Sequence, residues 1–219
     1  MQALEKCKLC EKTRLSIILN AGNHPFCNNF SIDRMEEEKT YLLKMGQCLS
    51  CGVIQLVNPP SYLEMVSKYD WIKYIEPEKH LDQVSEAIAL LPNITKDSKI
   101  IGLSYKEDST LDRLQKKGFT NLHRLNTLND LGIENKNSGI ESIQNALTPE
   151  KAREISIKNK KADVIIARHI LEHSHNPRVF LNAIRSLLKE GGYAIFEVPD
   201  CTNYLNNLDY TMIWEEHLF

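Results

Sequence analysis

Four of the six cysteines fall in two C-x-x-C pairs, Cys7 with Cys10 and Cys48 with Cys51. Each pair places two thiolates on one tight turn, and two such turns can close a tetrahedron around Zn²⁺. Four thiolates leave no coordination position for water or substrate, so this pattern predicts a structural zinc site. Reduced structural cysteines and a redox pair are the alternatives that the spacing leaves open.

A second group of reactive side chains lies at Arg168, His169, Glu172 and His173. The order H-x-x-E-H is typical of a zinc protease when both histidines lie on one continuous helix. Here a β-branched run ends just before His169, and the Asn-Pro pair at 176–177 breaks the chain just after, so such a helix is not expected. Two alternatives remain: Glu172 and His173 brace a loop, or the loop faces a bound ligand.

The elements around this second group predict how it is positioned. Residues 162–167 (ADVIIA) form a β-branched run that is typical of a strand buried on both faces. Pro177 suits the first turn of a helix, a glycine pair at 191–192 is expected to end that helix, and residues 193–198 are typical of a second strand. Such a unit belongs to a parallel sheet, whose ligands bind at the carboxyl ends of the strands. The group that begins near His169 lies at such an end.

Apolar spacing and turn residues predict further elements on both sides of this unit. They are helices from 78 to 91 and before Gly118, a helix start at Thr148-Pro149, and strands over 40–45, 53–57, 99–104 and 121–125. The fold class that follows is α/β, with a small N-terminal zinc-binding module rich in β-strands.

Composition narrows the classes of partner. The chain has 219 residues, with 42% hydrophobic and 26% charged side chains and a net charge of −2. The length allows one ordinary domain plus a small module. A balanced charge gives no basic field for nucleic acid, no apolar run approaches the roughly 20 residues of a membrane span, and the N-terminus lacks a signal-peptide core. We therefore expect a cytoplasmic protein with neither a nucleic-acid nor a membrane partner.

The string RHILEH…NP…FL…L…GG…FEVPD, from Arg168 to Asp200, resembles the fourth and fifth strands of class I S-adenosylmethionine-dependent methyltransferases. Together with the cysteine pairs, an aromatic segment at 68–74 and a late Glu-His pair, it is most similar to the zinc-containing sugar C-methyltransferases, which act on nucleotide-linked deoxysugars. The order and spacing of these features cover nearly the whole chain. The resemblance implies a Rossmann-like domain with S-adenosylmethionine as its cofactor and a nucleotide-linked sugar as its substrate.

The resemblance also implies which residues meet the cofactor. It assigns Gly102, Ser104 and Asp108 to the cofactor loop, and it turns Arg168 and His169 toward cofactor and substrate. Glycine is favoured in such a loop because a Cβ would block close approach of the backbone to the ligand.

This chain departs from the family's loop pattern, Glu-Ile-Gly-x-x-x-Gly. Gly102 stands where the acid belongs, and Ser104 and Asp108 stand where the glycines belong. The acid that would hold the ribose hydroxyls aligns near residues 125–126, which are Leu-Asn. A carboxylate that accepts two hydrogen bonds from a ribose is not replaced by either residue.

The catalytic residues that the resemblance implies lie mostly near the end of the chain. His217 would be the base that takes a proton from the carbon next to a ketone, Glu216 its partner, and Tyr69 a helper for the enolate. Imidazole suits this task because its pKa lies near neutrality and a carboxylate can orient it. Trp214 stands where the family often has Tyr.

We expect three parts: a zinc-binding module (1–65), a linker and helix (66–96), and a partial Rossmann-like methyltransferase domain (97–219). Family members continue with a further C-terminal domain, so we expect a fragment or a truncated relative, whose open sheet edge a C-terminal domain or a protein partner covers. The leading hypothesis is a C-methyltransferase of a nucleotide-linked keto-deoxysugar. The alternatives are a degenerate relative that binds without transferring methyl groups, and a zinc-ribbon binding module or another enzyme on the same sheet.

Overall fold

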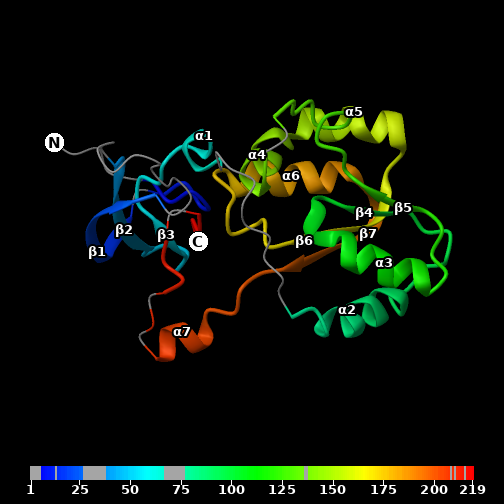
Figure 1. Ribbon diagram of the computed structural model, residues 1–219, viewed down its shortest axis with the longest axis horizontal. Helices are drawn as coiled ribbons and strands as arrows, with labels where there is room; N and C mark the ends of the chain where they lie inside the picture. Colours follow the sequence, from blue (N-terminus) through cyan, green and yellow to red (C-terminus); the bar gives the residue numbers. More distant parts are fainter. Residues whose placement is uncertain are drawn as a thin grey trace.

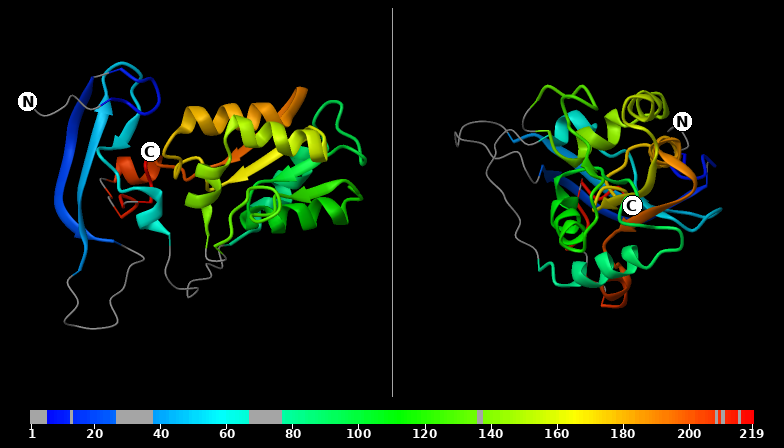
Figure 2. Two further views of the ribbon diagram at one scale, coloured as in Figure 1. Left: turned by 90° about the horizontal axis from the view of Figure 1, so that it is seen from above. Right: turned by 90° about the vertical axis from the view of Figure 1, so that its right-hand side faces the viewer.

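The computed structural model describes residues 6–12, 14–26, 38–66, 77–135, 138–207, 209, 211–214 and 216–219. They form a small β-rich module and a larger α/β domain, which lie side by side in Figures 1 and 2. The C-terminus lies close to β3 of the small module in Figure 1, so both ends of the described chain are on that side.

The small module is an antiparallel sheet of order β1-β2-β3. Its strands are β1 (Leu15–Pro25), β2 (Thr40–Cys48) and β3 (Ile54–Leu56). The last two confirm the strands expected from the sequence. The first was not predicted: two register shifts interrupt its pairing with β2, and Ile17 and Ile18 are both exposed, so it lacks a clean alternation.

The larger domain is built on a four-stranded parallel sheet of order β5-β4-β6-β7. Its strands are β4 (Ile100–Gly102), β5 (Leu122–Arg124), β6 (Ala162–Arg168) and β7 (Leu188–Glu197). Six of the seven residues of β6 are fully buried, as its β-branched run predicts for a central strand. The α/β class and the parallel sheet are therefore confirmed.

Helices cover both faces of this sheet (Figure 1). One apolar core joins the sheet to α4 (Ile140–Ala146), α5 (Pro149–Asn159) and α6 (Pro177–Leu187). A second core, on the other face, joins it to α2 (His80–Ala89) and α3 (Asp108–Lys116). The domain thus has the three-layer arrangement of doubly wound α/β folds.

Local sequence signals explain most helix boundaries. Thr148 and Asn176 cap α5 and α6 with their side-chain oxygens, and each helix has Pro in its first turn. The glycine pair at 191–192 does not end α6, which stops at Leu187. It lies inside β7 instead, where the pairing register with β6 shifts and Gly191 adopts a φ of 73°.

The C-terminal segment returns to the zinc module. Leu218 packs with Leu43 and Leu56, and its carbonyl accepts a hydrogen bond from the backbone N–H of Leu56 (2.9 Å). Its own N–H donates to the carbonyl of Glu172 in the loop after β6 (2.8 Å). Residue 218 therefore ties the module to the carboxyl ends of the sheet strands.

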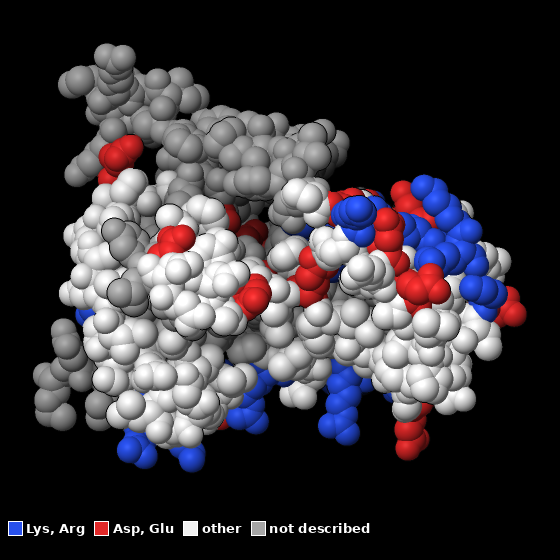
Figure 3. Space-filling model, turned by 90° about the horizontal axis from the view of Figure 1, so that it is seen from below, with Lys and Arg blue, Asp and Glu red and all other residues white. Residues whose placement is uncertain are grey.

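Two shorter helices complete the described elements: α1 (Tyr62–Met65), which follows β3, and α7 (Thr202–Asn206), which follows β7. Across the described part of the chain, every helix is too short or too polar to cross a membrane. On the face drawn in Figure 3, basic and acidic side chains are interspersed over the α/β domain.

Candidate functional site

The four cysteines of the two C-x-x-C pairs come together at one end of the small module. Their sulfur atoms all lie within 4.8 Å of one another, with 3.7 Å between Cys7 and Cys51 and 3.6 Å between Cys10 and Cys48. Four sulfurs placed tetrahedrally at about 2.3 Å from Zn²⁺ lie about 3.8 Å apart. The donor set therefore fits zinc, and Gly52, with a φ of 80°, completes the second turn.

The carboxyl ends of β4, β6 and β7 form a polar edge that we call the rim: Ser104, Glu107, Arg168 and Glu197. Glu107 lies at its centre with no exposed surface. Its carboxylate accepts hydrogen bonds from the backbone N–H and hydroxyl of Ser104 (2.5 and 2.9 Å) and from the N–H of Arg168 (2.6 Å). Burial raises the pKa of Glu107 to about 7 in spite of these bonds.

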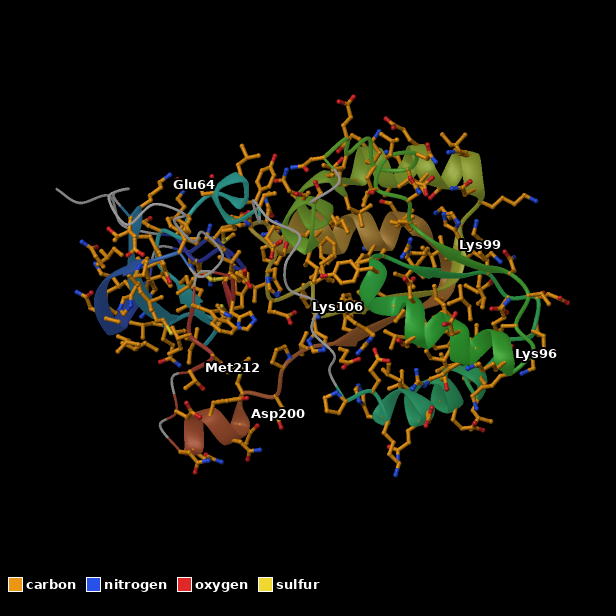
Figure 4. The ribbon with its side chains drawn as sticks, viewed as in Figure 1. Glu64, Lys96, Lys99, Lys106, Asp200 and Met212 are labelled. Carbon is orange, nitrogen blue, oxygen red and sulfur yellow. The ribbon has the colours of Figure 1, made fainter. Side chains whose placement is uncertain are left out.

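The Arg168 side chain, at the end of β6, is only 3% exposed and connects the other residues of the rim. Its guanidinium bonds to the Glu197 carboxylate (2.5 Å) and to the carbonyl of Lys106, which lies toward the zinc module in Figure 4. His80 and His169 each place Nε2 close to Glu197 as well (2.9 and 3.1 Å). Burial would raise the pKa of Glu197, but hydrogen bonds with Arg168 and His80 lower it to about 2.

The residues expected to hold S-adenosylmethionine do gather at these strand ends, but they do not form the family's ordinary pocket. A Cβ built on Gly102 would lie 2.7 Å from the Cβ of Glu107, so the side chain of Glu107 takes the space beside that glycine. Ser104 caps a short 3₁₀ turn at 105–107 in place of a glycine turn.

The ribose end of the expected cofactor site also differs. At the end of β5, Arg124 forms an ion pair with Asp108 (2.6 Å) across the entrance to α3. Leu125 is buried, and the N–H of Asn126 bonds to Asp130 (2.9 Å). In this arrangement the described residues do not fit the ordinary adenosyl contacts of the class.

A second polar group lies where the zinc module, α4, the loop after β6 and the C-terminal segment meet. We call it the junction cluster: Glu141, Glu172, His173, Glu216 and His217. The His217 ring lies 5.1 Å from the ring of His173 and 5.3 Å from that of Trp214. Its Nδ1 lies 3.0 Å from the carbonyl of Met212, which is labelled in Figure 4.

Several polar atoms in this cluster are buried without a hydrogen-bond partner. They are both carboxylate oxygens of Glu172, Nδ1 of His173 and, close by, Oγ of Ser174 and Nε1 of Trp214. Glu172 is 6% exposed, and its nearest ion-pair contact is with Nδ1 of His169 at 3.5 Å. Unsatisfied buried groups are rare in folded proteins and call for an explanation.

Glu141 and Glu216 approach His173 from two different elements. Oε1 of Glu141 lies 3.2 Å from Nδ1 of His173, but off the direction that a hydrogen bond from this nitrogen needs. A carboxylate oxygen of Glu216 lies within 4.8 Å of the same nitrogen. Burial would raise the pKa of Glu141, but the imidazole of His173 lowers it below the ordinary value.

The structure separates the residues that the sequence predicts for catalysis and cofactor binding. His217 and Glu216 lie in the junction cluster, whereas Gly102, Ser104 and Arg168 lie at the rim, and His169 lies between the two groups. Tyr69 lies outside the described residues. The loop of the H-x-x-E-H pattern is not helical, as expected, so the protease geometry does not form.

Two side chains of the rim and the junction cluster escaped the sequence analysis. Glu107 stands three residues after Ser104, and this Ser-x-x-Glu spacing is the capping-box signal that could have revealed it. Glu141 has no comparable signal, because only the tertiary fold brings α4 to His173.

A parallel α/β sheet joined to a four-thiolate module is the architecture of a zinc-containing class I methyltransferase. Residues 78–218 match the family model described as "Methyltransferase domain", and residues 7–65 match the one described as "Putative zinc binding domain". The first match covers more than half of the chain, which therefore belongs to the methyltransferase domain family. No curated protein matches the chain.

Proposed function

We propose that this methyltransferase acts on a carbon next to the ketone of a nucleotide-linked deoxysugar, with His217 as the base that forms the enolate. The observation that carries this proposal is the half-buried imidazole of His217, whose ring lies beside those of His173 and Trp214. A carbonyl oxygen only accepts hydrogen bonds, so Nδ1 of His217 must donate to Met212. In the neutral ring the lone pair is then on Nε2, which can take a proton.

The surroundings of His217 suit a base at neutral pH. Burial lowers its pKa below the ordinary value, so the imidazole is neutral there. The indole N–H of Trp214, whose ring lies beside that of His217, is a buried donor without a partner. It could donate to the oxygen on which the enolate charge develops, and we propose this role for it in addition to the one expected for Tyr69.

We propose that the methyl donor is S-adenosylmethionine, held by contacts other than the family's ordinary ones at Gly102 and Ser104, and that when bound it would supply the electrophilic methyl group. The chain's own residues bring the substrate carbon to His217, keep the junction cluster out of water and hold the rim rigid. Arg168 and Glu197 hold the rim rigid, because the guanidinium of Arg168 donates a hydrogen bond to the carboxylate of Glu197. The zinc module adds no reacting group, since its four thiolates complete the coordination of the ion.

Proton abstraction can be tested apart from methyl transfer. In D₂O, and without a methyl donor, the zinc-loaded chain should exchange the proton next to the ketone of a nucleotide-linked keto-deoxyhexose, as followed by NMR. His217→Ala should slow this exchange at least about 100-fold. His24→Ala, in β1 of the zinc module, should not change it. Equal exchange rates in wild type and His217→Ala would remove His217 from the chemistry.

A second candidate function is binding without methyl transfer, and the closed rim favours it. Glu107 and the Arg168–Glu197 pair fill the strand ends where the class holds its cofactor. Calorimetry with S-adenosylmethionine separates the two functions. Heat of binding with a micromolar dissociation constant supports the transferase, whereas no binding up to millimolar concentration supports the degenerate relative.

A further inference from the structure

Three side chains with metal-binding atoms converge in the junction cluster from distant parts of the chain. Glu141 comes from α4, His173 from the loop after β6 and Glu216 from the C-terminal segment. One ligand atom of each lies within 4.8 Å of the other two. The fold therefore assembles two carboxylates and one imidazole around a single point, and these three residues are far apart in the sequence.

The geometry at His173 fits a metal ligand. Its side chain is 9% exposed, and Nδ1 has no hydrogen-bond partner. Oε1 of Glu141 nevertheless lies 3.2 Å from this nitrogen. Two neighbouring ligand atoms, each about 2.1 Å from the same ion, are about 3 Å apart. The distance between Oε1 of Glu141 and Nδ1 of His173 is close to this value.

Glu172 provides an independent observation. It is 6% exposed, directly precedes His173 and leaves both carboxylate oxygens without a hydrogen bond. A buried carboxylate without donors is costly unless a cation stands near it. The junction cluster thus holds three carboxylates, and a divalent cation bound by Glu141, His173 and Glu216 would lower the cost of burying the charge of Glu172 in the adjoining loop.

We infer that Glu141, His173 and Glu216 form a second metal site, which takes a divalent cation such as Mn²⁺ and has Glu172 beside it. The two carboxylate ligands suit Mn²⁺ and the imidazole suits transition metals in general, whereas the four-thiolate centre favours zinc. Three protein ligands leave positions open for water or substrate oxygens. If the proposed function holds, the ion would polarise the ketone of the substrate next to His217. Binding of the ion does not depend on that function.

A purely structural role is the alternative explanation for this cluster. A protonated His173 could pair with Glu141 and Glu216 and make the cluster purely structural. The structure contains the His173–Glu141 contact at 3.2 Å, so this contact alone does not separate the two explanations. A structural ion pair predicts that added Mn²⁺ does not bind, which gives the two explanations opposite outcomes.

The test is a titration of the zinc-loaded full chain with Mn²⁺, followed by calorimetry and by the loss of the free-Mn²⁺ electron paramagnetic resonance signal. We expect one Mn²⁺ per chain in addition to the zinc. Glu141→Gln and Glu216→Gln should each weaken its binding at least about tenfold. Glu190→Gln, an exposed carboxylate of β7, is the matched control and should leave it unchanged. Zinc content and melting temperature establish that each variant is folded.

The inference is overturned if the wild type binds no Mn²⁺ at millimolar concentration, or if either variant, once shown to be folded, binds it as tightly as the wild type. The two variants lie on separate elements, so one folded variant is enough to decide. The titration contains neither sugar nor methyl donor. A chain that binds Mn²⁺ but exchanges no substrate proton therefore keeps the metal site and loses the proposed function.

Discussion

The rim and the junction cluster lie on either side of His169. They differ in whether their buried polar groups have hydrogen-bond partners. At the rim, the Glu107 carboxylate accepts three hydrogen bonds, and the Arg168 guanidinium is held by Glu197 and a carbonyl. In the junction cluster, Glu172 and His173 are also buried but leave polar atoms without hydrogen bonds. Satisfied networks stabilise a fold, whereas buried groups without hydrogen bonds call for an explanation such as a bound ion, an ordered water or a ligand.

This difference changes where the chemistry of the chain should be sought. The family resemblance directs attention to the strand ends at Gly102 and Arg168. The physical state of the side chains directs it instead to the junction, where His217 and Glu172 lie. The rim would then be a rigid support, and the junction the place that binds and reacts. Removing single groups from the two regions should have different consequences, and removing zinc should affect the junction through the module that covers it.

The largest expected effect comes from the zinc module. Cys48→Ser should unfold the module, because the binding free energy of a structural zinc is about 10 kcal/mol or more and replaces an apolar core. The Leu56–Leu218 hydrogen bond and the packing of the C-terminal segment should be lost with it. Amide hydrogen exchange should show β2, β3 and residues 216–219 unprotected, with β6 still protected. Cys201→Ser, an exposed cysteine, is the control.

Protection of residues 216–219 that survives in Cys48→Ser would contradict this prediction. It would mean that the junction holds the C-terminal segment without help from the zinc module.

The zinc site was predictable from the sequence and the side-chain contacts at the strand ends were not, and both outcomes have one physical origin. C-x-x-C spacing fixes the local geometry of each cysteine pair. The only long-range contact that the zinc site needs is the meeting of the two turns. The strands and caps near Pro177 and Thr148 are local in the same way. The contacts of Glu107, Arg168 and Glu141 depend on which helix packs against which strand end, and no short-range pattern encodes this.

The rim is expected to show the next largest effect. Glu197→Gln should lower the free energy of unfolding by about 2–4 kcal/mol at pH 7, because it leaves the buried Arg168 charge without its main partner. The pKa of Glu197 is lowered from 4.5 to about 2, so its stabilisation is present above pH 4.5 and is lost as the pH falls toward 2. The variant should therefore be less sensitive to acid over that range.

Urea unfolding at several pH values measures both effects, and Glu190→Gln on the same strand provides the control. If Glu197→Gln is as stable as the wild type at pH 7, the rim is not the rigid support described here.

The junction should respond in the opposite direction. Glu172→Gln should leave the free energy of unfolding unchanged or raise it by about 1 kcal/mol in the absence of added Mn²⁺. The reason is that the substitution removes a buried charge whose two oxygens accept no hydrogen bond. Urea unfolding under the conditions used for Glu197→Gln gives a direct comparison. A loss as large as that of the rim variant would show that Glu172 is paired in solution and would erase the contrast between the two regions.

The smallest effect is a change in pH dependence at Glu107. Its pKa is raised to about 7 from an ordinary 4.5, so between these values the folded state binds the proton that the unfolded state has released. This contribution is fully present below pH 4.5 and makes the wild type less stable as the pH rises toward 7. Glu107→Gln removes it, so its curve of unfolding free energy against pH should slope less steeply downward there, by at most about 1.4 kcal/mol per pH unit. Parallel curves for the two proteins would show that Glu107 is already ionised at pH 5 and that the Arg168 charge, rather than burial, governs the centre of the rim.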